Sequence, residues 1–156
     1  MAKELSESEK RLQEMANAEM AKADSKENIA KEIQEKRQKE EAEFKSKYFG
    51  LETNHIRKAI SSIRTAFKQH AIDIAPEAIH GQHKNRVLLN PVGITIKLVP
   101  LTTVVVFGDM FKKRVIIELT SHNGTERREY EFNPDELTKD SILELFMEYR
   151  EYLQNK

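Results

Sequence analysis

Two histidines separated by two residues, His80 and His83, have the spacing in this chain that most directly suggests chemistry. Imidazole nitrogens this close can share one zinc ion, and His70, Asp73 or Glu77 would then be candidate third ligands. Zinc sites normally carry a second ligand pair at a defined distance, however, and His-x-x-His is common by chance. We therefore interpret both histidines as exposed loop residues, and we predict no metal and no cofactor.

A set of basic side chains has the composition of a phosphate-binding surface. Arg57, Arg64 and Lys68 fall on one stripe of an expected helix, and Lys84 and Arg86 extend the set. Such clusters contact nucleic-acid backbones, but no aromatic residues are interleaved with them to stack on bases. We favour a simpler interpretation, in which the stripe is solvated or pairs with the acidic face of the C-terminal helix.

Two other short patterns have structural explanations that we favour over functional ones. Lys112, Lys113 and Arg114 follow the turn signal Gly108-Asp109. A basic turn beside a strand discourages edge-to-edge association, and the alternative is an anion contact or a localisation signal. Asn123-Gly124-Thr125 matches a glycosylation acceptor, but without a secretory signal it indicates a hairpin turn.

Recognisable catalytic motifs are missing from the sequence. It contains no nucleophile elbow, no glycine-rich phosphate loop and no zincin helix. The chain also has no cysteine, which excludes disulfides, thiolate metal sites and a cysteine nucleophile. We therefore predict that the protein is not an enzyme, and we infer no small-molecule substrate.

The composition also limits the partners and the compartment. The 156 residues include 26 Lys/Arg and 26 Asp/Glu, so the formal net charge is zero, which argues against a general polyanion binder. The sequence shows neither a signal peptide nor an apolar run near the roughly eighteen residues that a membrane span needs. The expectation is a cytoplasmic protein that does not contact a membrane.

The elements that would position these residues include a strand-rich block at residues 87–132. Apolar and polar residues alternate from Ile94 to Leu98, and Thr102 to Phe107 is a β-branched and aromatic run typical of a central strand covered on both faces. Further strands are expected at 87–89, closed by an Asn90-Pro91 turn, at 114–120 and at 126–132. Because no helical crossover separates them, we expect a meander of four or five antiparallel strands.

Two amphipathic helices are expected to cover one face of this sheet. Gly50 would end the N-terminal helix, and the second helix would begin at Thr53 or Asn54, with an apolar face made of Ile56, Ile60, Ile63, Phe67 and Ala71. A polar loop would follow from Pro76 to Asn85. The C-terminal helix would begin at Asn133-Pro134, with these apolar side chains on one face: Ile142, Leu145, Phe146, Tyr149, Tyr152 and Leu153. The predicted fold class is therefore α+β, in two layers.

Residues 1–47 are predicted to form an extended charged helical arm, and residues 48–156 a globular α+β domain. The arm consists of helix formers without glycine or proline. Its large apolar residues form a thin stripe in two short series, first Leu5, Leu12 and Met15 and then Ile29, Ile33 and Phe44, and we interpret the second series as not continuing the heptad of the first. Because the stripe is not a sustained a/d repeat over three or four heptads, it fails the coiled-coil criterion. Either the arm is a helix that pairs weakly or orders against a partner, or it is a mostly solvated tail.

These features favour a non-catalytic protein-interaction or assembly protein. A long helical arm on a compact domain without a reactive constellation suggests a homo-oligomer that binds another protein. We expect the six apolar residues of the arm to make these contacts. A nucleic-acid-binding accessory protein that uses the basic set is the alternative hypothesis, and it predicts an affinity that falls steeply with salt concentration.

Overall fold

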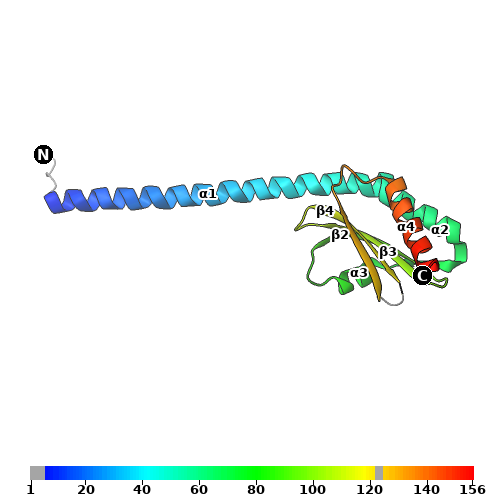
Figure 1. Cartoon of the computed structure of the whole chain (residues 1–156). Coiled ribbons are helices and arrows are strands. Elements are labelled where there is room, and N and C mark those ends of the chain that lie inside the picture. Colours follow the sequence, from blue (N-terminus) through cyan, green and yellow to red (C-terminus); the bar gives the residue numbers. More distant parts are fainter. Residues whose placement is uncertain (1–5, 122–124) are drawn as a thin grey trace. The chain divides into compact units, whose positions relative to one another are not determined.

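The computed structural model describes residues 6–121 and 125–156, and it confirms the predicted α+β fold (Figure 1). The elements follow one another as α1 (Glu7–Leu51), η1 (Glu52–Ile56), α2 (Arg57–Phe67), η2 (Lys68–His70), β1 (Ala71–Ile74), α3 (Pro76–Gln82), β2 (Leu88–Ile96), β3 (Thr102–Asp109), β4 (Arg114–Ser121), β5 (Glu126–Phe132) and α4 (Lys139–Gln154). The chain forms two units that divide between Glu40 and Glu41. Within the described residues, no helix is both long enough and apolar enough to cross a membrane.

Five antiparallel strands form one sheet, and each strand pairs with its neighbours in the sequence, in the order β1-β2-β3-β4-β5. The central strand β3 pairs with β2 on one side and with β4 on the other. Its side chains alternate between the two faces of the sheet, and Val104, Val105, Val106 and Phe107 are all buried. The strand is therefore covered on both faces, as its apolar composition predicts.

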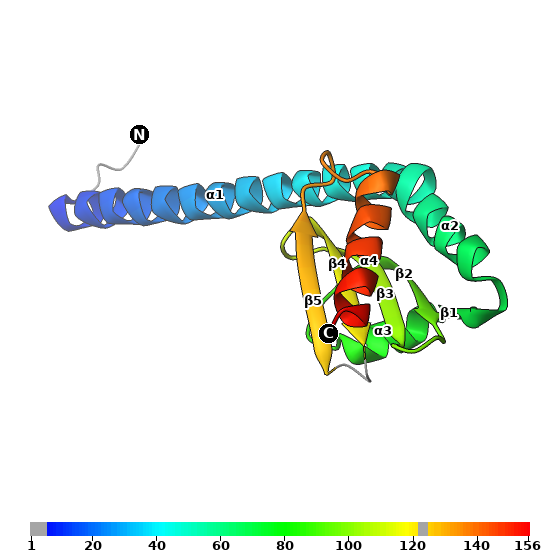
Figure 2. The same ribbon diagram turned by 45° about the vertical axis from the view of Figure 1, so that its right-hand side comes forward.

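Helices α2 and α4 cover one face of the sheet (Figure 2). Apolar residues recur every three or four positions in both helices, and Ile60, Ile63 and Phe146 are buried in the same cluster as Ile117 of β4. Burying a side chain of this size contributes roughly 1.5–3 kcal/mol, so this apolar contact holds both helices on the sheet. Tyr152, predicted to share the apolar face of α4, is instead 40% exposed.

The opposite face of the sheet carries the short helix α3, where the sequence predicted a polar loop. That prediction is wrong. Pro76 stands in the first turn of α3, where its fixed φ suits a helix. Ile79 is fully buried beside Phe107 and Ile116. Burial against the sheet therefore folds a segment whose local pattern does not predict a helix.

The second helix ends earlier than predicted, and the residues after it form an edge strand. Lys68, just after Phe67, has a φ of 51°, and a positive φ cannot continue a right-handed helix. The segment Ala71–Ile74 then pairs antiparallel with β2. Two of its four residues are isoleucines, whose branched side chains favour strands. Ala71 therefore belongs to the sheet and not to the apolar face of α2.

Gly50 does not end a helix. The helical chain continues through it into the π-helical turn Glu52–Ile56 and on into α2, so the predicted helix starts at Thr53 and Asn54 are also wrong. Tyr48 is fully buried just before the glycine. This burial outweighs the roughly 1 kcal/mol that a glycine costs in a helix interior.

Asn90-Pro91 is an irregularity inside one strand, where the sequence predicted a turn between two. The pairing of β2 with β3 shifts register between Leu89 and Val92. Asn90 has a φ of 39°, a region that asparagine enters more readily than most residues. Its carbonyl accepts a hydrogen bond of 3.1 Å from the Tyr48 hydroxyl. The turn residues therefore form a β-bulge.

Helix α4 begins at Lys139, later than the predicted start at Asn133-Pro134. Asn133 instead begins a turn in which its carbonyl accepts a hydrogen bond of 2.9 Å from the amide of Glu136. The N-cap is Thr138, whose hydroxyl accepts a hydrogen bond of 3.2 Å from the amide of Ser141. Both sites carry good capping residues, and the helix begins at the second, ahead of the buried Ile142 and Phe146.

Two short connections join the last three strands in the sequence, after Asp109 and after Ser121. The predicted Asn123-Gly124 turn lies outside the described residues, but β4 and β5 pair on either side of it, beginning at Ser121 and Glu126. In the basic turn between β3 and β4, the ammonium of Lys112 lies 2.5 Å from a carboxylate oxygen of Glu131. This basic turn is therefore tied to the neighbouring strand.

Candidate functional site

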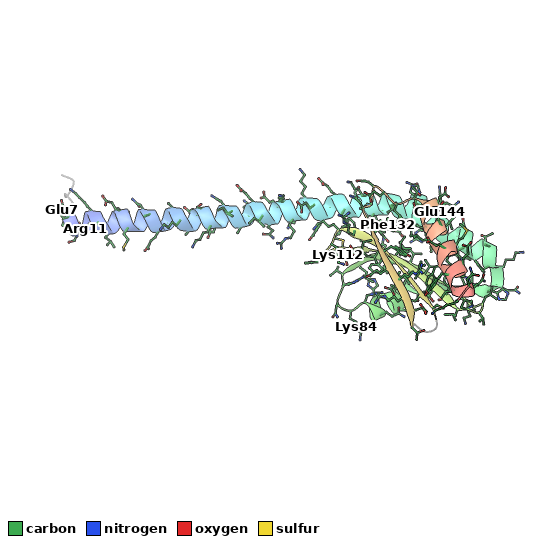
Figure 3. All side chains as sticks on the ribbon, viewed as in Figure 1. Glu7, Arg11, Lys84, Lys112, Phe132 and Glu144 are labelled. Atoms are coloured by element: carbon green, nitrogen blue, oxygen red, sulfur yellow. The ribbon has the colours of Figure 1, made fainter. Side chains whose placement is uncertain are left out.

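The N-terminal segment, residues 7–40, carries most of the predicted partner-binding residues. Leu12, Met15, Ile29 and Ile33 expose 60%, 54%, 54% and 55% of their surface. Side chains project outward along the whole segment in Figure 3. Leu5, the first residue of the predicted set, lies outside the described residues. These four apolar side chains are therefore exposed along the segment.

Phe44, the last residue of the predicted set, is placed elsewhere. It is 4% exposed, and its ring centroid lies 6.2 Å from that of Tyr48. The unit that contains the sheet begins at Glu41, ahead of the boundary predicted at Tyr48. Phe44 is thus a core residue of this unit, and its burial removes it from the surface offered to a partner.

Two basic residues of α2, Arg57 and Arg64, are paired with carboxylates near them in the sequence. Arg57 Nη2 lies 2.6 Å from Oε1 of the buried Glu52, and Arg64 Nη2 lies 2.6 Å from Oδ1 of Asp73. These carboxylates belong to η1 and β1, whereas the sequence suggested the acidic face of the C-terminal helix. The pairing reduces the positive charge that this stripe offers to a phosphate backbone.

The other basic residues do not join this stripe into one surface. Lys68 is exposed just after α2, which packs on one face of the sheet. Lys84 and Arg86 follow α3, which packs on the opposite face. Arg86 Nη1 also lies 2.6 Å from Oε1 of Glu129. The sheet therefore separates the two halves of the predicted basic set.

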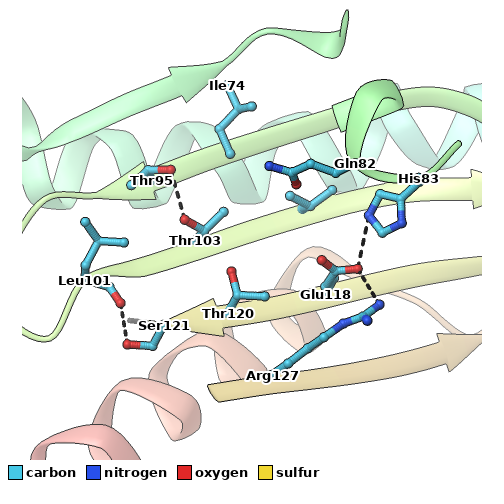
Figure 4. Close-up of a pocket in the computed structure, with 11 residues that line it drawn as sticks. Ile74, Gln82, His83, Thr95, Leu101, Thr103, Glu118, Thr120, Ser121 and Arg127 are labelled. Carbon is cyan, nitrogen blue, oxygen red and sulfur yellow. Dashed lines mark hydrogen bonds and ion pairs between the residues drawn. The ribbon is translucent and has the colours of Figure 1, made fainter. Parts of the chain in front are cut away.

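A polar pocket of about 660 Å³ opens on the face of the sheet that carries α3 (Figure 4). The strand register builds its floor, because Thr95 lies opposite Thr103, Thr103 opposite Thr120, and Thr120 opposite Arg127. Side chains directly opposite each other share a face, so the three threonines form a row that ends at a guanidinium group. Sequence reasoning missed this row because it exists only once the register is known.

Glu118 is the buried charge of the pocket, at 7% exposure. Arg127 donates a hydrogen bond of 2.9 Å from Nη2 to its Oε2 and lies 3.6 Å from Glu129. The hydrogen bond from Arg86 holds the pKa of Glu129 below its ordinary value, and the same bond raises the pKa of Arg86. Charges of alternating sign therefore cross this face of the sheet and compensate the carboxylate of Glu118.

His83 closes the pocket at the end of α3. Its Nε2 lies 3.2 Å from Oε2 of Glu118, although the two atoms are not aligned as a hydrogen bond, and its ring lies 5.1 Å from that of Phe107. The prediction of an exposed loop residue is wrong for His83, whose side chain is 9% exposed, whereas His80 is exposed on α3. In the described ranges no three His, Asp or Glu side chains come together as metal ligands.

Several polar groups of the pocket are paired with one another. The hydroxyls of Thr95 and Thr103 are 3.0 Å apart, and the hydroxyl of Ser121 donates to a backbone carbonyl. A carboxylate can orient an imidazole for general-base catalysis. Here Nε2 of His83 faces the carboxylate of Glu118.

One signal in the sequence pointed to this pocket. Glu118 interrupts the apolar run from Val115 to Leu119, and a charge within a buried strand normally has a compensating partner. The sequence does not identify that partner, because His83 and Arg127 come from other elements.

Comparison with protein-family models, with curated proteins and with solved structures finds no match to this chain.

Proposed function

We propose that this protein is a non-catalytic assembly protein that binds a second copy of its own chain through the N-terminal segment. The observation that carries the proposal is the set of large apolar side chains exposed on one uninterrupted helix: Leu12, Met15, Ile29 and Ile33. Removing apolar surface from water is worth roughly 25 cal/mol per Å². Pairing two copies would cover the stripe of each copy with that of the other.

The charged residues of the segment stabilise the helix, but they do not cover its apolar stripe. Three Glu–Lys pairs are spaced four residues apart: Glu27–Lys31, Glu32–Lys36 and Glu35–Lys39. Each such pair adds roughly 0.2–0.5 kcal/mol to an isolated helix. Isolated helices are still only marginally stable in water, so association along the apolar stripe would add stability that the segment lacks alone.

The non-catalytic part of the proposal is supported by the chemistry of the polar pocket. Its buried carboxylate, Glu118, is held by Arg127 and faced by His83. Groups that compensate one another in this way stabilise the fold. They are not poised for proton transfer to a substrate.

No observation favours the nucleic-acid hypothesis to the same degree. Arg57, Arg64 and Arg86 each lie against a carboxylate, and the basic residues stand on opposite faces of the sheet. A surface that tracks a phosphate backbone needs its cations together.

Light scattering on a sizing column tests the proposal with the full chain. The chain has a mass of 18.2 kDa, and we expect the wild-type protein to elute with twice that mass at micromolar concentration. The double variant Leu12→Asn, Ile29→Asn should elute as a monomer, because two amides replace the apolar side chains that a partner would cover.

Met20 offers a matched control. Its side chain is 55% exposed, as much as those of the stripe, but it lies off the stripe on the helix. Met20→Asn should therefore leave the dimer intact. A wild-type chain that stays monomeric up to hundreds of micromolar would contradict the proposal, as would equal loss of the dimer in Met20→Asn.

A further inference from the structure

Four exposed apolar residues of the N-terminal segment share a single heptad frame, so the interpretation that the second series does not continue the first is wrong for Ile29 and Ile33. Leu12 and Ile33 are three heptads apart, and Met15 and Ile29 are two heptads apart, so they occupy positions a and d of the same repeat. The frame is hard to see because charged residues stand at the three intervening positions, Glu19 at a, Lys22 at d and Lys26 at a. The a and d positions from Leu12 to Ile33 thus form one continuous stripe, which is apolar at both ends and charged at its centre.

We propose that two copies pair through this stripe as antiparallel helices, with Leu12 against Ile29 of the other copy and Glu19 against Lys22. The inference rests on the self-association proposed above and specifies its geometry. Reversing one helix places the a positions of one copy opposite the d positions of the other. Two-fold symmetry then produces each of these contacts twice.

The charged centre of the stripe excludes a parallel pair in register. In that arrangement Glu19, Lys22 and Lys26 would each face the same residue of the other copy. Three consecutive layers of like charge would then occupy the middle of the interface, and like-charge contacts are destabilising. The antiparallel arrangement instead sets Glu19 against Lys22 and Lys26 against Met15, so no layer has like charges.

Charge also selects the register of the antiparallel pair. In the proposed register Arg11, at position g, lies beside Glu32 of the other copy, which adds a second opposite-charge contact to that of Glu19 with Lys22. Sliding one copy by a heptad in one direction brings Lys22 against Lys26. The structure supplies the condition for these contacts, because one uninterrupted helix carries all five residues.

The apolar ends of the stripe argue against a shift in the other direction. Leu12 and Ile29 meet twice, and Met15 is covered by the aliphatic stem of Lys26, whose ammonium can reach water. Sliding the copies by a heptad in the other direction sets Leu12 against Lys22 and loses the apolar pair. The e and g positions beside the stripe are mostly small and would let the two backbones approach closely: Ala16, Ala18, Ala23, Ser25 and Ala30.

Disulfide trapping tests the geometry, because the natural chain has no cysteine and each engineered thiol is unique. The full-length variants Leu12→Cys and Ile29→Cys are mixed in equal amounts in a glutathione redox buffer. Facing positions of paired helices come within the roughly 4.4–6.8 Å between Cα atoms that a disulfide spans. We expect the mixed disulfide between residues 12 and 29 to exceed either self-disulfide at least tenfold, as measured by peptide mass after digestion.

Each outcome of this experiment has a separate meaning. Met20→Cys, which lies off the stripe, sets the background of random oxidation. Self-disulfides of Leu12→Cys above that background would overturn the antiparallel arrangement and leave self-association standing. A monomeric wild-type chain, with no disulfide above background, would overturn the proposed function itself.

Exchanging the central charges gives a second and independent readout. Glu19→Lys should weaken the dimer roughly tenfold, because a Lys–Lys contact would replace each Glu–Lys contact. Lys22→Glu should do the same, and the double exchange Glu19→Lys, Lys22→Glu should restore the wild-type dissociation constant. In a parallel pair the double exchange leaves every layer with like charges, so a failure of rescue would overturn the proposed register.

Discussion

In residues 41–156 the large apolar side chains are covered mainly by the same unit, whereas in residues 7–40 they remain in contact with solvent. Ile117 and Phe107 have no exposed surface, while Leu12 and Ile29 expose 60% and 54% of theirs. The charged residues differ in the same way. Glu118 is buried and compensated by its neighbours on the sheet, whereas the charged side chains of residues 7–40 are exposed.

The difference teaches that the two units obtain their stability from different sources. A sheet covered on both faces provides its own core, and substitutions there act on folding. The apolar side chains of residues 7–40 are exposed, so in the proposed dimer substitutions there should act on association. Changes of the same chemical kind should therefore have different consequences in the two units.

The largest expected contrast comes from shortening an isoleucine in each unit. Ile117→Ala should lower the free energy of unfolding by about 2–5 kcal/mol, because it leaves a cavity between the sheet and α2. Ile29→Ala should change the unfolding of residues 41–156 by less than about 0.5 kcal/mol and weaken the dimer instead. Urea denaturation followed by circular dichroism measures the first effect, and light scattering over a dilution series the second. Equal loss of folding stability in both variants would break the comparison.

Two glycines provide the next contrast. A Cβ atom on Gly93 would lie 3.1 Å from Cδ1 of both Ile74 and Ile79, so Gly93→Ala should destabilise the fold by about 1–3 kcal/mol. A Cβ atom on Gly50 meets nothing within 4 Å. Gly50→Ala should therefore stabilise the continuous helix by about 0.5–1 kcal/mol. A destabilising Gly50→Ala would indicate that Gly50 has a positive φ and ends the helix. That result would contradict the continuous helix.

The smallest expected contrast concerns pH. Because Arg86 lowers the pKa of Glu129, their pairing stabilises the fold above the ordinary carboxyl value of 4.5, and this stability is lost as the pH falls through the lowered folded value. Between pH 7 and pH 3 the wild type should therefore lose more stability than Arg86→Gln. Lys10 lies on the N-terminal segment, away from the apolar stripe. Lys10→Gln should therefore lose as much stability between pH 7 and pH 3 as the wild type. Identical acid dependence in Arg86→Gln and the wild type would rule out this contribution.

Local patterns were sufficient to predict the sheet and the helices that cover it. The buried face of each element is indicated by the spacing of its apolar residues. Examples are the alternation in β2, the apolar run in β3, and the spacing of three to four residues between Ile56, Ile60 and Ile63. Boundaries failed where packing overrides a local signal. Gly50 stays helical beside the buried Tyr48, and α3 forms because the sheet buries Ile79.

The two candidate sites differ in how well the sequence predicts them. The apolar residues of the N-terminal segment were identifiable from one helix alone, although charged residues between them obscured their shared frame. The polar pocket was not identifiable, because Thr95, Thr103 and Thr120 meet only through the register of three strands. Long-range pairing of this kind leaves no periodic signal in the sequence.

Hydrogen exchange of the full-length chain at two protein concentrations tests the central claim most directly. We predict that amides of residues 7–40 become more protected as the concentration rises, because the second copy stabilises that helix. Amides in β3 and β4 should exchange at rates that do not depend on concentration, since their protection comes from the core of their own unit. Weak protection of residues 7–40 that does not change with concentration would contradict the account.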